Sequence, residues 1–118
     1  MTTVDEVADR ASERGSSSGE ARRNAMLDPE DLEAIYRTAI RIRLFEERTA
    51  LLFQEGLVKG TAHSYVGEEA IASAVGRRLE KADYIGSYHR GHGHCIAKGA
   101  EVSRMMAELM GRGTGYCG

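Results

Sequence analysis

The sequence predicts an α/β protein whose 118 residues are mostly helical. An apolar stripe with helical spacing begins near Asp28, and a shorter one follows Gly67. One candidate strand, residues 83–88, runs into a segment rich in histidine and glycine. A strand with helices around it is typical of a parallel sheet, and a parallel sheet needs further strands. We therefore expect the chain to be the first part of a larger domain, or a chain that needs a partner.

Composition narrows the class of protein. A chain with 42% hydrophobic and 29% charged residues fits one soluble globular unit. The net charge of -2 and the pI near 6.1 argue against nucleic acid or an anionic membrane as the main partner. No signal peptide or membrane span is recognisable, so we expect a cytoplasmic protein. Cys95 and Cys117 have no CxxC spacing and are expected to be reduced thiols.

Two regions are predicted along the chain. Residues 1–27 are polar and small, and few of their apolar side chains are spaced for burial, so we expect a disordered tail. Arginines in this region suggest an organelle transit peptide, but the interspersed acidic residues argue against one. Residues 28–118 are expected to form the structured domain.

The first helix is predicted to begin at Asp28, which can cap it, with Pro29 at the first helical position. Gly56 supplies its stop. Charged residues off the apolar stripe are predicted to be a solvated face, with a subunit interface as the alternative. The stripe consists of Leu32, Ile35, Ala39, Ile42, Phe45, Thr49 and Leu52, and the charged face of Arg37, Arg41, Glu47 and Arg48.

Two shorter helices follow. The first covers residues 67–79, where the small side chains of Ala70, Ala74 and Gly76 favour close packing and predict a buried helix. The second follows Gly99, contains the apolar positions of residues 102–109, and is ended by Gly111.

Chemistry-bearing residues concentrate after the candidate strand. Three of the four histidines fall within residues 89–94, together with Arg90 and two glycines. Glycine lets the backbone approach a ligand, arginine offers a fork of donors for phosphate oxygens, and imidazole donates or accepts near neutral pH. The pattern favours a diphosphate-binding loop at the carboxyl end of a strand.

Other interpretations of these histidines stay open. His89, His92 and His94 could ligate a transition metal, although no second ligand cluster accompanies them. The segment could also be a polar, solvated loop. His63, alone between two glycine-bounded turns, could be a structural histidine, and Glu68 and Glu69 are ordinary acids for the first turn of a helix.

Three motifs in order resemble one enzyme family. They are His63 followed by the Gly-Glu-Glu-Ala of residues 67–70, the His-Arg-Gly-His-Gly of residues 89–93, and the Met-Ala-Glu-Leu of residues 106–109. Residues 28–118 are similar to the α subunits of thiamine diphosphate-dependent 2-oxo acid dehydrogenases, including pyruvate and acetoin dehydrogenases. Residues 89–95 look more like the acetoin type, because His89 stands where the pyruvate type has tyrosine.

The resemblance implies a role for each residue. Arg90 and His89 would bind the diphosphate of the cofactor, and His63 would act as a catalytic residue that also lies near the cofactor. His92 would brace the loop. The fold implied is a thiamine diphosphate-binding domain with a doubly wound parallel sheet. Magnesium would bridge the diphosphate, with ligands expected beyond the end of this chain, because the family's Gly-Asp-Gly motif does not occur here.

The resemblance also implies activity and partners. The function would be oxidative decarboxylation of a 2-oxo acid such as pyruvate, or cleavage of acetoin, with acyl transfer to lipoamide. A dehydrogenase β subunit, in a heterotetramer, and a lipoyl-bearing acyltransferase would be the partners. This chain alone is expected to be inactive. Two alternatives stay open: a catalytically inactive, truncated chain that only binds a partner, and a small histidine metal-binding module.

Overall fold

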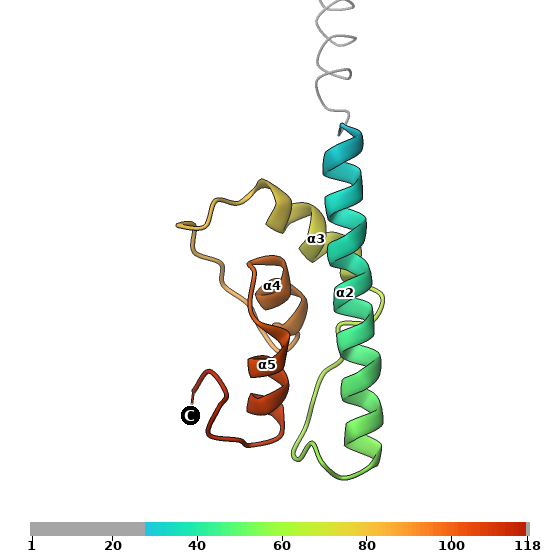
Figure 1. The fold of residues 1–118 in the computed structure, drawn as a ribbon, viewed down its shortest axis with the longest axis vertical. Helices are drawn as coiled ribbons and strands as arrows, with labels where there is room; N and C mark the ends of the chain where they lie inside the picture. Colours follow the sequence, from blue (N-terminus) through green and yellow to red (C-terminus); the bar gives the residue numbers. More distant parts are fainter. Residues whose placement is uncertain (1–27, 118) are drawn as a thin grey trace, which may run out of the picture. The chain divides into compact units, whose positions relative to one another are not determined.

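The computed structural model describes residues 28–117, so the expectations for residues 1–27 lie outside the described part. All the packing below belongs to the compact unit that begins at Asp31. Four helices follow in order: α2 (Pro29–Gln54), α3 (Glu69–Arg78), α4 (His92–Ala97) and α5 (Val102–Leu109) (Figure 1). None of the described helices has the length and apolar character that a membrane span requires.

The long helix α2 confirms the first predicted helix. It begins at Pro29, and Gly56, with φ of +74°, follows its end, a backbone conformation that glycine adopts without strain. The middle and end of the predicted stripe are buried, whereas Leu32 at its start is 53% exposed. The buried stripe residues are Ile42, Phe45, Thr49 and Leu52.

Helices α3, α4 and α5 all lie on the same side of α2 (Figure 1). A single apolar core joins them to the buried side of α2, and this core removes their apolar surface from water. Helices α3 and α4 approach closely at Gly76, where an added Cβ would lie 2.6 Å from the Cβ of Ala97. The buried core residues are Ile42, Phe45, Tyr65, Ala72, Ile96 and Met105.

Helix α3 is present, but the prediction that it is buried was wrong. Ala72 and Ser73 face the interior, whereas Ile71 is 61% exposed and Val75 49% exposed. Apolar periodicity identifies a face that favours burial, but another element must cover that face. No element of residues 28–117 covers this side of α3.

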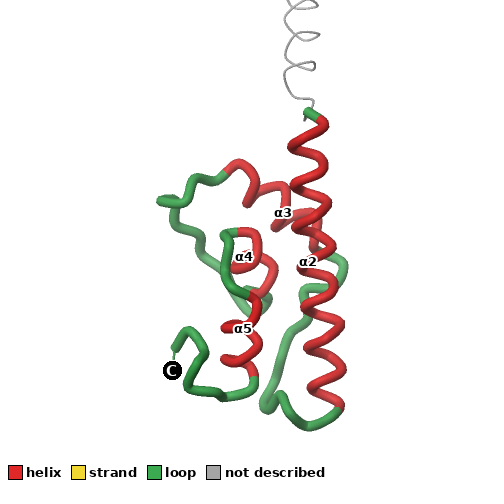
Figure 2. The backbone as a smooth tube through the Cα atoms, viewed as in Figure 1, coloured by secondary structure: helices red, strands yellow, loops and turns green. Residues whose placement is uncertain are grey.

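The predicted strand at residues 83–88 was also wrong for the described part of the chain, which contains no strand (Figure 2). A strand is defined by hydrogen bonds to a neighbour, and no described segment pairs with this one. It crosses the surface as a loop, with the side chains of Tyr84 and Tyr88 almost fully exposed.

Helix α4 replaces the second half of the predicted histidine loop. It begins at His92, so His92 and His94 are helical residues. Glycine in a helix costs about 1 kcal/mol relative to alanine, which is why Gly93 argued for a loop. Packing overrides that preference: a Cβ at Gly93 would lie 2.5 Å from Cε1 of Tyr65, so only glycine lets the ring lie there.

The segment after α5 folds back and is hydrogen-bonded to it. The hydroxyl of Tyr116 accepts a hydrogen bond from the backbone N–H of Glu101 at 2.7 Å, and the guanidinium of Arg104 lies 4.4 Å from the centre of the Tyr116 ring. A carboxylate oxygen of Glu108 accepts a hydrogen bond from the N–H of Cys117 at 2.8 Å. These contacts order the glycine-rich residues 110–117 against α5.

Candidate functional site

An open cavity of about 310 Å³ lies where the loop before α4 faces the start of α3. The loop of residues 86–90 forms one wall and includes His89 and Arg90. Tyr65 and Glu68, on the approach to α3, and His94, on α4, complete the lining. The structure thus brings two of the three sequence-predicted site residues to one cavity.

Arg90 is the cation of this cavity and it already contacts an acid. Its Nη1 donates a hydrogen bond to Oε1 of Glu68 at 2.8 Å, and both side chains are roughly half exposed. Such an exposed pair contributes little to stability, so the guanidinium is available to a competing anion. Glu68 is therefore a counter-ion that any anionic ligand at Arg90 must displace or share.

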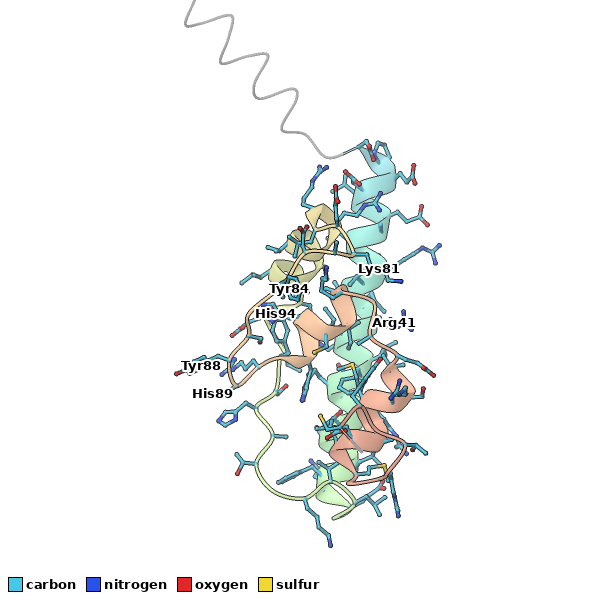
Figure 3. The ribbon with its side chains drawn as sticks, turned by 90° about the vertical axis from the view of Figure 1, so that its left-hand side faces the viewer. Arg41, Lys81, Tyr84, Tyr88, His89 and His94 are labelled. Atoms are coloured by element: carbon cyan, nitrogen blue, oxygen red, sulfur yellow. The ribbon has the colours of Figure 1, made fainter. Side chains whose placement is uncertain are left out.

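His63 lies at the rim of the cavity, outside its lining. Its ring centre is 5.0 Å from that of His89, which in turn is 4.8 Å from the ring of Tyr88. Figure 3 shows Tyr88 and His89 projecting outward from the loop, whereas His94 lies closer to the helices. The third predicted site residue is thus next to His89, on an exposed face.

His92 points away from the cavity and into the interface between α4 and α2. Its Nδ1 lies 2.7 Å from Oε1 of Glu46, and its ring meets the edge of Phe45 at 5.6 Å. The Glu46 side chain is only 2% exposed. This contact ties the first residue of α4, and therefore the loop before it, to the long helix.

His94 lies on the cavity side of α4. Its ring packs perpendicular to that of Tyr65, with centres 5.4 Å apart. Burial raises the pKa of the Tyr65 phenol, with a smaller effect from Glu68, so the phenol stays neutral over the physiological range. Tyr65 is 1% exposed and forms a buried part of the cavity lining.

Glu69, the neighbour of Glu68, is the first residue of α3. Glu69 accepts a hydrogen bond from Nε of Arg43 at 2.6 Å and others from the N–H of Gly67 at 3.0 and 3.1 Å. The hydrogen bond from Arg43 holds the pKa of this carboxyl at about 2, below its ordinary value of 4.5. Glu69 is therefore more than a first-turn acid, because it links α3 to α2.

Sequence reasoning missed Glu46, Tyr65 and the role of Asp31. Glu46 follows Ile42 by four residues, so helical spacing alone would place an acid on the buried stripe and suggest a buried partner. Asp31, in the first turn of α2, is buried and contacts Arg77 at 2.6 Å and Arg78 at 3.0 Å. No local signal identifies Tyr65, because Gly93 lies 28 positions away in the sequence.

The three histidines of residues 89–94 diverge. His89 faces His63, His92 faces Glu46 and His94 faces Tyr65. Residues 28–117 contain no group of three histidine, cysteine or acidic side chains placed to hold a metal ion. Within the described chain, the arrangement gives no support to a histidine metal-binding module.

Comparison with known proteins decides the family. The family described as "Dehydrogenase E1 component" matches residues 36–118, which include the cavity and every histidine. The chain belongs to this family. Membership of the dehydrogenase E1 family confirms the resemblance stated from the three motifs, and it makes the chain a relative of oxidoreductase α subunits. No solved structure matches the chain.

Curated relatives in the E1 family are named for two substrates. The chain is 48% identical over 83 residues to the α subunit of an acetoin:2,6-dichlorophenolindophenol oxidoreductase of Bacillus subtilis, covering 70% of this chain and 25% of the relative. It is 46% identical over 91 residues to the same subunit of Cupriavidus necator, covering 77% and 27%. It is 40% identical over 89 residues to the pyruvate dehydrogenase E1 α subunit of Zymomonas mobilis, covering 75% and 25%. The chain thus spans about a quarter of the length of these relatives.

Proposed function

We propose that this chain is part of the α subunit of a thiamine diphosphate-dependent dehydrogenase, and that the cavity beside Arg90 receives the cofactor's diphosphate. The observation that carries the proposal is that Arg90 and His89 line one cavity, with His63 against His89. Membership of the E1 family supports it.

The donors at this site fit a diphosphate. A guanidinium presents a planar fork of N–H donors that matches phosphate oxygens, and an imidazole adds one further donor. Arg90 already holds a carboxylate oxygen of Glu68, so its donors are oriented toward an anion. Magnesium would share the diphosphate, with its ligands supplied from outside these residues.

Each residue then has a defined task. Arg90 and His89 bind and orient the diphosphate, and His92, through Glu46, keeps the loop in place. His63, at the rim, donates a hydrogen bond to the carbonyl oxygen of the substrate or transfers a proton to it. When bound, thiamine diphosphate supplies the nucleophilic thiazolium carbon that this chemistry requires.

The substrate we propose is acetoin, with pyruvate as the second candidate. The relatives at 48% and 46% identity carry acetoin in their names, and the relative at 40% carries pyruvate. Either substrate would deliver an acetyl unit to lipoamide on a lipoyl-bearing acyltransferase. A dehydrogenase β subunit would complete the enzyme as a heterotetramer.

The complete fold we propose is the doubly wound parallel sheet expected from the sequence. Its strands would come from outside the described residues. The outward side of α3, with Ile71 and Val75, would be covered in the same assembly.

The test is cofactor binding by the intact protein assembled with its β subunit. Calorimetric titration with thiamine diphosphate and Mg²⁺ should show binding at least about tenfold weaker for Arg90→Gln than for the wild type, because a hydrogen bond to a charged group is lost. Arg37→Gln is the matched control, since Arg37 forms an exposed pair with Glu33 on α2. Equal dissociation constants for the wild type and Arg90→Gln would refute the proposal.

A partner-binding chain without catalysis is the second candidate. The side of α2 away from the core exposes Tyr36 by 67%, Ile40 by 41% and Leu44 by 60%, which is a continuous apolar strip with four-residue spacing. This candidate predicts stable assembly with the β subunit but no detectable binding of thiamine diphosphate by the wild type, an outcome that the same titration would reveal.

A further inference from the structure

We propose that His94 is a further ligand-binding residue of this site, and that its Nε2–H donates a hydrogen bond to a phosphate oxygen held beside Arg90. The inference rests on the proposed function, because it concerns the same cavity. His94 and Arg90 both line that cavity, one from α4 and the other from the loop before it. His94 thus lines the same cavity as Arg90 from a different element of the fold.

The state of the other ring nitrogen defines which atom of His94 can act. Nδ1 is buried and has no hydrogen-bond partner, and it is the only such side-chain atom among the described residues. A buried N–H without an acceptor is unfavourable, so the hydrogen of a neutral imidazole resides on Nε2. Nε2 is therefore the donor, and His94 lines the cavity in which the ligand would lie.

The ring is held in place from below. Tyr65 meets it perpendicularly at 5.4 Å, and Tyr65 is itself 1% exposed and packed against Gly93. His92, two residues earlier, points into the core toward Glu46. The contact of His92 therefore holds the backbone of α4, and Tyr65 holds the His94 ring. Together they restrict the direction of the Nε2–H donor.

Packing alone does not explain an imidazole at position 94. A phenylalanine would keep the perpendicular ring contact with Tyr65 and would bury no unpaired nitrogen. The cost of burying Nδ1 without a partner is offset if Nε2 binds something, and the lining of the cavity supplies a cation, Arg90, that attracts phosphate. The chemical class of ligand is a diphosphate, to which His94 adds one neutral donor.

The experiment is a calorimetric titration of the intact protein, assembled with its β subunit, with inorganic pyrophosphate as the probe. His94→Phe removes the donor and keeps the ring, whereas His94→Gln places an amide N–H close to the position of Nε2. We expect binding about tenfold weaker for His94→Phe and within about threefold of the wild type for His94→Gln. A His94→Phe protein that binds pyrophosphate as the wild type does would overturn the inference.

A second pair of variants covers a failure of His94→Phe to fold, which its thermal unfolding would reveal. His94→Asn places its amide near the position of Nδ1, away from the cavity, so it should bind several-fold more weakly than His94→Gln. Equal binding by these two variants would also overturn the inference. Arg90→Gln separates the proposals: if it binds pyrophosphate normally, the proposed function fails; if it binds weakly while His94→Phe is normal, only the role of His94 fails.

Discussion

Nδ1 of His92 lies 2.7 Å from Oε1 of Glu46, and the Glu46 side chain is 2% exposed within the interface of α2 and α4. An acid in such a position is tolerated only with a partner, because the isolated charge loses its hydration. His92 is that partner, and it is the first residue of α4. The histidine that begins α4 is thus held by the long helix rather than by the cavity it adjoins.

Removing the imidazole should therefore destabilise the protein. We expect His92→Leu to lower the free energy of unfolding of the intact protein by about 3 kcal/mol, because Glu46 is left buried and unpaired. Urea unfolding gives this value. The double variant Glu46→Leu/His92→Leu should recover part of the loss, and Arg37→Leu, which breaks an exposed pair, should change stability by less than about 1 kcal/mol. A loss as large in the double variant as in His92→Leu would contradict this account of Glu46.

Glu68 should limit the affinity of the cavity for anions. Its carboxylate holds Nη1 of Arg90 at 2.8 Å, so a ligand must compete with it. Glu68→Gln removes the charge and keeps the shape, and we expect inorganic pyrophosphate to bind roughly threefold to tenfold more tightly. Glu33→Gln, in the exposed pair with Arg37, is the control and should leave binding unchanged. Weaker binding by Glu68→Gln would mean that Glu68 assists the ligand instead.

Glu69 should make stability depend on pH in the acid range. Its pKa is lowered from 4.5 to about 2, chiefly by the hydrogen bond from Arg43. The stabilisation from Glu69 is fully present above its unfolded pKa and is lost as the pH falls from 4.5 toward 2. The difference in free energy of unfolding between the wild type and Glu69→Gln should therefore shrink over this range. Glu47→Gln, which alters a long 3.8 Å contact with the same arginine, should show a much smaller change.

Gly76 should not tolerate the substitution that helices ordinarily favour. Glycine to alanine in a helix is expected to stabilise by about 1 kcal/mol. Here the new Cβ would lie 2.6 Å from the Cβ of Ala97, so we expect Gly76→Ala to destabilise by about 1–3 kcal/mol through overpacking. Gly113→Ala is the control, because its Cβ would meet nothing within 4 Å. Thermal unfolding of the two variants compares them, and a higher unfolding temperature for Gly76→Ala would rule out a tight contact between α3 and α4.

Helices with strong local signals could be predicted from the sequence. Asp28, Pro29 and Gly56 delimit α2 within two residues, and the buried positions of its stripe follow from spacing alone. Helix α4 could not be predicted, because Gly93 and the preceding Gly91 locally disfavour a helix. The packing of Gly93 against Tyr65 depends on a residue that is distant in the sequence. The exposure of Ile71 and Val75 could not be predicted for a related reason. Their apolar periodicity indicates that burial is favourable, but it does not identify the element that would cover them.

Part of the candidate site could likewise be predicted from the sequence, and part of it could not. The order of motifs and the chemistry of arginine and histidine predict residues 63, 89 and 90 as site residues. In the structure His89 and Arg90 line one cavity, and His63 lies against His89. Three other features depend on how side chains are oriented in space. They are the carboxylate of Glu68 beside Arg90, the buried Glu46 that contacts His92, and the unpaired Nδ1 of His94. No pattern of residue types carries that information, because each pair is separated by 20 residues or more or lies on a helix that the sequence did not reveal.

The absent side chain at Gly93 has a consequence for motion. Because the ring of Tyr65 packs against the backbone of α4 with no space for a side chain between them, we expect the two to move together. Tyr65 lies two residues after His63, and Gly93 lies three residues after Arg90. We therefore expect the separation between His63 and Arg90 to change little when other parts of the protein move.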